Sequence, residues 1–243
     1  MNKLKIISSF MSLTIFLFFS FSCNNTVTEA NDSDNESSET AQIRFIHSAS
    51  STSELDFAYR DLTDGNFYIL THETTYGHQY GYYDFLTGER EIRLYFSYSD
   101  IAVAGAKITL KNDKKYTVIA YDYEATINPE LMVLNDTLAV PDSGMSYVRF
   151  IHTGIDVSPI QISEKDSSNF ISELNRLDNS NYMEFQARTY YFKVISTQSK
   201  EIILEVDPIT FLSGHSYSII FSGSISDITT IDFNAKVYRE SSI

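Results

Sequence analysis

The 243-residue chain is 43% hydrophobic and 14% aromatic, which is enough apolar material to fill a core and excludes a wholly disordered protein. Its formal charge of −14 repels polyanions, so nucleic acid is excluded as a partner. Only 9 Gly and 4 Pro occur, which excludes collagen-like and low-complexity classes, and the single cysteine, Cys23, cannot form an internal disulfide.

Residues 1–22 have the layout of a secretory signal peptide, with Lys3 and Lys5 before the apolar run IISSFMSLTIFLFFSFS. Ser22 directly precedes Cys23, and Ser20 stands where a lipobox usually has Leu. This arrangement resembles the lipobox of bacterial lipoproteins, in which the cysteine is diacylated and becomes the new N-terminus. The resemblance implies a lipid anchor on Cys23 and a place at the outer membrane, on its periplasmic face or at the cell surface. Ordinary cleavage and an uncleaved membrane anchor remain open as alternatives.

Residues 23–40 form an acidic segment, NNTVTEANDSDNESSET after Cys23, with five carboxylates, no base and almost no apolar side chain. Such a segment cannot bury enough surface to offset the entropy lost on ordering. We therefore expect a disordered tether between the anchor and the folded part of the chain.

From Gln42 onward the pattern changes to short strands. Alternation of apolar and polar residues with a period of two is clear at Ile43–Phe45 and Ile92–Phe96, and turn signals such as Asp64-Gly65 separate the runs. The one stretch with room for two helical turns is Phe170–Leu177. The pattern predicts an all-β protein built as a sandwich or a barrel.

The tetrapeptide RFIH occurs twice, at Arg44–His47 and again 105 residues later at Arg149–His152. Further anchors repeat in the same order: Phe85 and Ile92 match Phe185 and Phe192 at a separation of 100, and Tyr116 matches Tyr217 at 101. The repeat predicts two tandem Ig-like β-sandwich domains, residues 41–142 and 146–243. The short joint between them, Pro141–Gly144, favours a fixed mutual orientation and a cleft between the domains.

Each copy opens with an R-F-I-H strand, continues with an apolar strand (Leu55–Phe57; Ile160–Ile162) and later has KKYTVIA or HSYSIIF. This order resembles the bacterial family called domain of unknown function 4397, whose members begin with a strand of the type V-R-F-V-H-A-S and later carry G-x-x-Y-T-V. The resemblance covers most of residues 41–243. It implies a β-sandwich on an exported or lipid-anchored protein, often in tandem, and supplies no activity.

His47 and His152 are the first candidates for a chemical site. Each falls where its strand ends, so its ring can bond the backbone of the following loop and fix the turn. A zinc site would need three or four converging ligands, and none stands at ligand spacing; the nearest carboxylate, Asp56, is replaced by Gln161 in the second copy. We therefore predict a structural role for both histidines, no metal site and no cofactor.

The second candidate is the aromatic stretch THETTYGHQYGYYDF, residues 71–85. Exposed tyrosines stack on sugars or peptides, so Tyr76, Tyr80, Tyr82, Tyr83 and His78 are candidate ligand contacts. The alternative is a strand pair in which alternate rings pack inward and the others cover an edge.

Catalysis has little support, because the sequence lacks a G-x-S-x-G elbow and acylation would remove Cys23 as a nucleophile. We therefore expect a non-catalytic cell-envelope lipoprotein with a binding or structural role. Its partners would be the membrane, through the lipid anchor, and an envelope protein or glycan. The alternatives are a glycan- or peptide-binding surface lipoprotein that uses the tyrosines of the first copy, and a hydrolase whose residues the sequence does not reveal.

Overall fold

The computed structural model describes residues 39–123, 128–136, 140–165, 169–226 and 231–240, all of them within one compact unit, Ser38–Ile243. Every regular element among these residues is a β-strand, so the predicted all-β class is confirmed. Within these ranges, no helix is long and apolar enough to cross a membrane. The predicted signal peptide and all but the last residues of the predicted tether lie outside the described residues.

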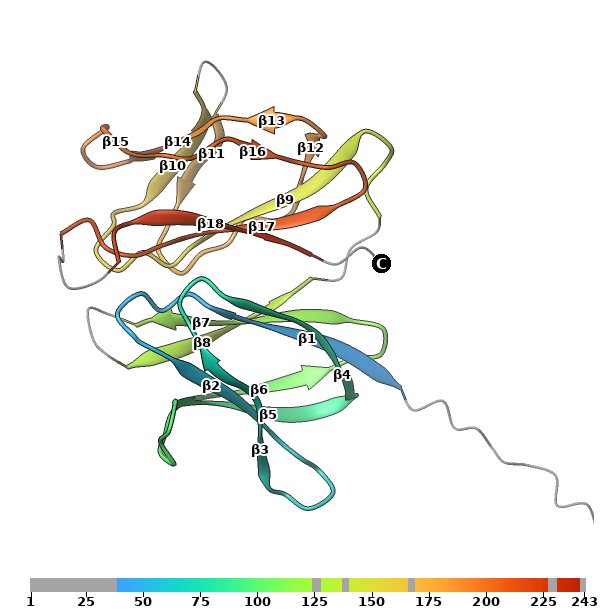
Figure 1. The fold of residues 1–243 in the computed structure, drawn as a ribbon. Coiled ribbons are helices and arrows are strands. Elements are labelled where there is room, and N and C mark those ends of the chain that lie inside the picture. Colours follow the sequence, from blue (N-terminus) through green and yellow to red (C-terminus); the bar gives the residue numbers. More distant parts are fainter. Residues whose placement is uncertain (1–38, 124–127, 137–139, 166–168, 227–230, 241–243) are drawn as a thin grey trace, which may run out of the picture. The chain divides into compact units, whose positions relative to one another are not determined.

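Residues 40–135 form a first sandwich of two four-stranded sheets that lie face to face (Figure 1). One sheet has the order β4-β1-β7-β8 and the other β3-β2-β5-β6, and every pairing is antiparallel except β1 with β7. The strands are β1 (Thr40–His47), β2 (Leu55–Arg60), β3 (Phe67–Thr74), β4 (Gln79–Leu86), β5 (Gly88–Phe96), β6 (Ala102–Leu110), β7 (Lys115–Asp122) and β8 (Pro129–Asn135).

Residues 145–239 form a second sandwich, with sheets β12-β9-β17-β18 and β11-β10-β14-β15 and a small extra pair, β13-β16. Corresponding strands stand in the same order in both sandwiches, and β9 pairs with β17 in parallel as β1 does with β7. The strands are β9 (Met145–His152), β10 (Ile160–Glu164), β11 (Asn169–Leu174), β12 (Met183–Gln186), β13 (Thr189–Tyr190), β14 (Phe192–Ser196), β15 (Ile202–Glu205), β16 (Ile209–Thr210), β17 (Ser216–Ser222) and β18 (Asn234–Arg239).

The stretch Phe170–Leu177, which has room for two helical turns, does not form a helix. Most of this stretch belongs to strand β11, where Ile171 pairs with Ile162 and Leu174 with Ile160 of β10. The ladder supplies the backbone hydrogen bonds that a short isolated helix would have had to make alone, and an eight-residue helix is marginal without tertiary support. The predicted hairpin turn at Asp64-Gly65 is present, with Gly65 at a positive φ of 75° between β2 and β3.

Strands β1 and β9 are buried on both of their faces. Ile43 and Phe45 point into the core of the first sandwich, as the alternation predicts, but Arg44 and Ile46 on the opposite face are also 1% exposed or less. An antiparallel sheet of a free sandwich normally leaves that outer face to water. The outer face of each RFIH strand is therefore covered by something else.

The cover is the other sandwich. Ile46, Ile119, Ile151, Ile220 and Tyr238 form one buried apolar cluster that draws on β1 and β7 of the first sandwich and on β9, β17 and β18 of the second. The sequence predicted a cleft between the two copies. The faces that carry the repeated motif are instead packed against each other. Each face bears apolar side chains, and their removal from water favours this contact.

Candidate functional site

The two arginines of the RFIH motifs meet at the centre of the contact between the sandwiches. Arg44 is 1% exposed and Arg149 is 2% exposed. The Nε of Arg44 donates to Thr117 Oγ1 at 2.6 Å, and the Nε of Arg149 donates to Ser218 Oγ at 2.8 Å. Thr117 and Ser218 stand at equivalent positions of β7 and β17, so each arginine first binds the hydroxyl of its own sandwich.

Each arginine also crosses to the other sandwich. Arg44 Nη2 donates to Ser218 Oγ at 3.1 Å and to Glu240 Oε1 at 2.9 Å. Arg149 Nη2 donates to Thr117 Oγ1 at 3.3 Å and forms a close ion pair with Asp136. The exchange is reciprocal, as in a two-fold symmetric interface, although both sides belong to one chain.

Two carboxylates and two tyrosines complete this network. Asp136 accepts from Thr117 and from the hydroxyl of Tyr82, the latter at 2.9 Å, while Glu240 accepts from Ser218 at 2.9 Å and from Tyr182. Tyr82 lies beneath the guanidinium of Arg44, whose Cζ is 5.5 Å from the ring centroid, and Tyr182 lies at 4.7 Å from Arg149 in the same way. We call these eight residues the arginine network: Arg44, Tyr82, Thr117, Asp136, Arg149, Tyr182, Ser218 and Glu240.

The electrostatics of the arginine network balance. Burial alone would lower the pKa of Arg44, but the charge of Asp136, followed by Tyr82 and Glu240, raises that pKa above its ordinary value. Burial, and the hydrogen bond to the nearby carboxylate, raise the pKa of Tyr82 and of Tyr182, so both remain neutral donors. Two cations face two anions in a buried contact, and ion pairs and hydrogen bonds of these groups cross between the sandwiches, although Arg44 Nη1 has no hydrogen-bond partner among the described residues.

Sequence reasoning missed Asp136 and Glu240 because neither lies in a motif. A signal was present, since Tyr82 and Tyr182 are separated by 100 residues, Thr117 and Ser218 by 101, and Asp136 and Glu240 by 104. These separations match those of the apolar anchors, and a polar residue repeated at a strand position points to a shared buried contact.

His47 and His152 bind their own loops, as predicted. His47 Nδ1 accepts from Ala49 N at 3.2 Å and its Nε2 donates to Ser53 O at 2.9 Å, while His152 Nδ1 accepts from Gly154 N at 3.2 Å. Burial lowers the pKa of each ring to about 4, so both are neutral at physiological pH. Among the described residues no group of three His, Cys, Asp or Glu side chains is placed to hold a metal ion.

The five candidate ligand contacts of residues 76–83 do not share one face. Tyr76 shares a hydrogen bond with the second sandwich, with its hydroxyl 2.7 Å from Ser222 Oγ, and Tyr82 belongs to the arginine network. Tyr83 packs beside Phe45 at 6.3 Å in the first core, while Tyr80 lies against His78, with the two ring centroids 4.9 Å apart. His78 is exposed. Tyr82 has a counterpart in Tyr182 of the second sandwich.

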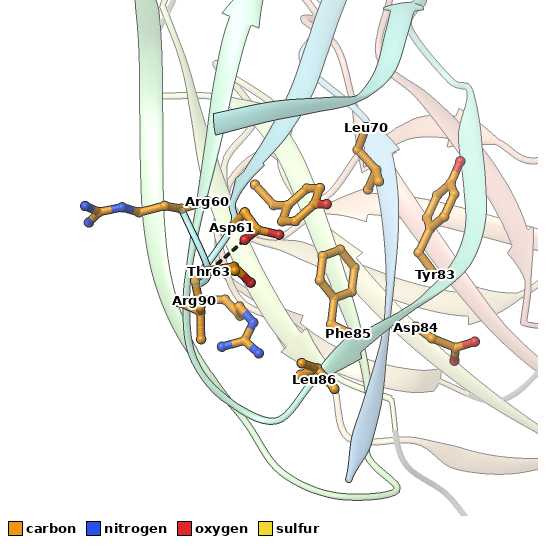
Figure 2. Close-up of a pocket in the computed structure, with 11 residues that line it drawn as sticks. Arg60, Asp61, Thr63, Leu70, Tyr83, Asp84, Phe85, Leu86 and Arg90 are labelled. Carbon is orange, nitrogen blue, oxygen red and sulfur yellow. Dashed lines mark hydrogen bonds between the residues drawn. The ribbon is translucent and has the colours of Figure 1, made fainter. Parts of the chain in front are cut away.

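A pocket of about 270 Å³ lies at the open side of the first sandwich, between the edge strand β4 and the strands β2, β3 and β5 (Figure 2). We call it the Arg90 pocket. Its walls include aromatic and aliphatic side chains, a carboxylate and an arginine: Tyr59, Leu70, Tyr83, Phe85, Asp61 and Arg90. Figure 2 shows Arg60 extending away from the pocket, whereas Arg90 points to the space beside Phe85 and Leu86.

Comparison with known families gives the first independent evidence on identity. The family model described as "Domain of unknown function (DUF4397)" matches residues 62–163. These residues belong to the DUF4397 family. The match begins in the turn after β2 and ends in β10, so it holds β3 to β8 of the first sandwich and β9 and β10 of the second. Because corresponding strands recur in the same order, this DUF4397 window contains one strand for each of the eight positions. The family resemblance predicted from the motifs is thus confirmed for this segment.

A search of curated proteins finds no match to this chain. Among solved structures, the chain is similar to the TIE protein of Bacillus anthracis, with 6% identity, a TM-score of 0.25, and coverage of 81% of this chain but 34% of that one. A family CBM26 module from Eubacterium rectale Amy13K, solved with maltoheptaose, has 10% identity, a TM-score of 0.25 and coverage of 83% and 97%. A putative cell adhesion protein from Bacteroides ovatus has 8% identity, a TM-score of 0.26 and coverage of 84% and 98%.

The one residue predicted to carry covalent chemistry, Cys23, lies outside the described residues. Its acylation is a prediction from the sequence.

Proposed function

We propose that this DUF4397 protein is a non-catalytic cell-envelope lipoprotein, anchored through Cys23, whose two sandwiches act as one rigid binding or structural body. The observation that carries the proposal is the arginine network. It uses Arg44, Arg149, Asp136 and Glu240, each no more than 5% exposed, to join two sandwiches rather than to face a substrate. A multi-sandwich body joined in this way presents fixed surfaces, and the acidic tether holds those surfaces away from the membrane.

The anchor is tested by growing cells with a radioactive fatty acid and comparing the wild type with Cys23→Ser. We expect the label on the wild-type protein and none on the variant, whose abundance and export are followed by immunoblotting of cell fractions. Equal labelling of the two proteins would contradict the lipoprotein proposal. Protease treatment of intact cells then distinguishes the cell surface, where the chain is cut, from the periplasmic face, where it is protected.

A second candidate within the same proposal is a glycan- or peptide-binding role for the first sandwich. The specific observation in its favour is the Arg90 pocket, in which Tyr59, Tyr83 and Phe85 supply rings for stacking and Asp61 and Arg90 supply polar groups. Of the five residues predicted as ligand contacts, only Tyr83 lines this pocket.

A further inference from the structure

Arg90 occupies a position where the strand pattern calls for an apolar residue. It alternates with Ile92 and Leu94 on the inward face of β5, and it is only 4% exposed. Within the described part of the chain its one hydrogen bond runs from Nη1 to the carbonyl of the adjacent Glu89, at 2.9 Å. Among the described residues, no carboxylate oxygen lies within 4.0 Å of its guanidinium nitrogens. A guanidinium has five N–H donors, and those of Arg90 that have no protein partner are open to solvent at the pocket.

The surroundings of Arg90 do not compensate its charge. Burial lowers the pKa of Arg90, and the more distant Asp61 offsets only part of that effect. The other carboxylate of the pocket, Asp84, accepts a hydrogen bond from Gln42 Nε2 at 2.9 Å. Arg44 and Arg149 differ from Arg90, because each of these two arginines meets a carboxylate within 3 Å.

The second sandwich shows what the same location looks like when it is filled. By strand register and by a constant separation of 100 residues, three residues that line the Arg90 pocket correspond to three aromatic residues of the second sandwich: Leu70 to Phe170, Phe85 to Phe185 and Arg90 to Tyr190. There the rings pack closely, with centroids 4.9 Å apart for Phe170 and Phe185 and 5.2 Å for Phe185 and Tyr190. Tyr190 is 3% exposed.

The lining of the Arg90 pocket therefore differs between the copies, at Leu70 and Arg90 among other positions. Leu70 is smaller than the ring of Phe170, and Arg90 places a charged group where Tyr190 completes an aromatic cluster. In the second sandwich aromatic rings fill this space. In the first sandwich the space is open, and the guanidinium of Arg90 points into it. An open space at a core position destabilises a fold, which is expected where a ligand supplies the missing contacts.

We infer that the Arg90 pocket binds a small monocarboxylate that carries an apolar ring or ring face. The carboxylate would accept two hydrogen bonds from the free donors of Arg90, and the ring would lie against Tyr59, Leu70 and Phe85. Asp61 and Asp84 at the pocket repel a dianion such as a phosphate monoester more strongly than a ligand with a single negative charge, so a monocarboxylate is favoured over a dianion. The volume of about 270 Å³ admits one ring. This inference rests on the binding role proposed above.

Two sources share this chemistry, a sugar acid and an aromatic organic acid, and matched probes distinguish them. Isothermal titration of the purified full chain in a neutral detergent uses D-glucuronate against D-glucose, and phenylacetate against 2-phenylethanol. We expect one of the two acids to bind and its neutral partner to bind at least about tenfold more weakly. If neither acid binds, or if an acid and its neutral partner bind equally, the inference is wrong.

Variants locate the binding. Arg90→Tyr copies the residue of the second sandwich, and we expect it to abolish binding of the acid while raising the melting temperature, because a ring replaces an uncompensated charge. Arg90→Met removes the charge without adding a ring and should weaken binding at least about tenfold. The matched control is Arg60→Gln, an exposed arginine of the same pocket that points away from it. Unchanged binding in Arg90→Met would refute the inference. Failure of this test leaves the lipid anchor untouched, since the fatty-acid labelling measures Cys23 alone.

Discussion

Replacing Glu240 by Gln is the sharpest test of the arginine network. The carboxylate lies 2.9 Å from Arg44 Nη2 and 3.7 Å from Arg149 Nη2, and it is buried from water. Gln keeps the shape and the Oε1 acceptor, so the substitution chiefly removes one charge. At an effective dielectric constant of 20, a pair of unit charges 4 Å apart is worth about 4 kcal/mol. Part of this lost attraction is offset, because the variant no longer has to desolvate the charge of Glu240. The variant also leaves two buried cations, Arg44 and Arg149, with Asp136 as the remaining carboxylate of the network.

We therefore expect Glu240→Gln to lower the free energy of unfolding by about 3–5 kcal/mol, the range for breaking a buried ion pair. The assay is urea denaturation followed by tyrosine fluorescence, since the chain has 17 Tyr and no Trp. Arg44→Met combined with Glu240→Gln restores neutrality, so the double variant should lose less stability than the sum of the single variants, by about 1 kcal/mol or more.

The matched control is the exposed pair of Lys107 and Glu89, whose N–O distance is 3.4 Å and whose side chains are 70% and 67% exposed. Lys107→Met should change the free energy of unfolding by less than about 0.5 kcal/mol. A Glu240→Gln protein that unfolds within about 1 kcal/mol of the wild type would show that the network is not a coupled buried unit, and the reasoning would fail.

Three further outcomes follow from the described residues. Burial lowers the pKa of His47 and of His152 from an ordinary 6.5 to about 4, so on acidification the unfolded chain binds protons at these rings before the folded chain does. The stability that the neutral rings provide is complete above pH 6.5. It falls between pH 6.5 and pH 4 by about 1.4 kcal/mol per pH unit for each ring. His47→Gln should reduce this pH slope by about half of the histidine contribution, as measured by urea denaturation at a series of pH values. Gly223→Ala should lower the melting temperature and destabilise the fold by about 2–3 kcal/mol, because φ is 97° and a Cβ would lie 2.5 Å from the carbonyl oxygen of Asp232. Ile151→Ala, at a fully buried position of the contact between the sandwiches, should cost about 2–5 kcal/mol in urea denaturation.

Each of these has a control within the chain. His78 is exposed, so His78→Gln should leave the pH slope unchanged, and an equal loss of slope in both histidine variants would refute the assignment. Gly81→Ala should be neutral, since a Cβ there meets nothing within 4 Å. Ile202 is 52% exposed, and Ile202→Ala should cost less than about 1 kcal/mol. A Gly223→Ala or Ile151→Ala protein as stable as its control would contradict the packing described above.

Much of the architecture was accessible from local patterns, because a strand places successive side chains on opposite faces and each face reports its own surroundings. Ile43 and Phe45 showed the core face of β1, and the repetition of RFIH with Phe85, Ile92 and Tyr116 showed that a second set of strands would follow the first. The histidines at the strand ends could also be read locally, since their partners lie within six residues. The family followed from the same repeated strands.

What covers the outer faces could not be read in that way. Arg44 pairs with Glu240, which is 196 residues away, and Arg149 shares Thr117 with Arg44, so the arginine network depends on how two finished sheets pack. The tyrosines of residues 76–83 looked alike in sequence, yet they are divided among the sandwich core, the arginine network and the edge of the first sandwich. Only the tertiary structure shows this division. The register of β1 and β4 shifts between Ile43, which pairs with Tyr83, and Phe45, which pairs with Tyr80, and this β-bulge changes the face of β4 on which the tyrosines lie.

The Arg90 pocket lies between these two cases. Arg90 stands in the period-two register of Ile92 and Leu94, so local alternation is enough to place a charged residue on a core face. The packing of the sandwich leaves the space beside it open, and among the described residues no carboxylate oxygen lies within 4.0 Å of its guanidinium. Alternation fixes the direction in which a side chain points, whereas its partners depend on the packing of strands that are distant in the chain.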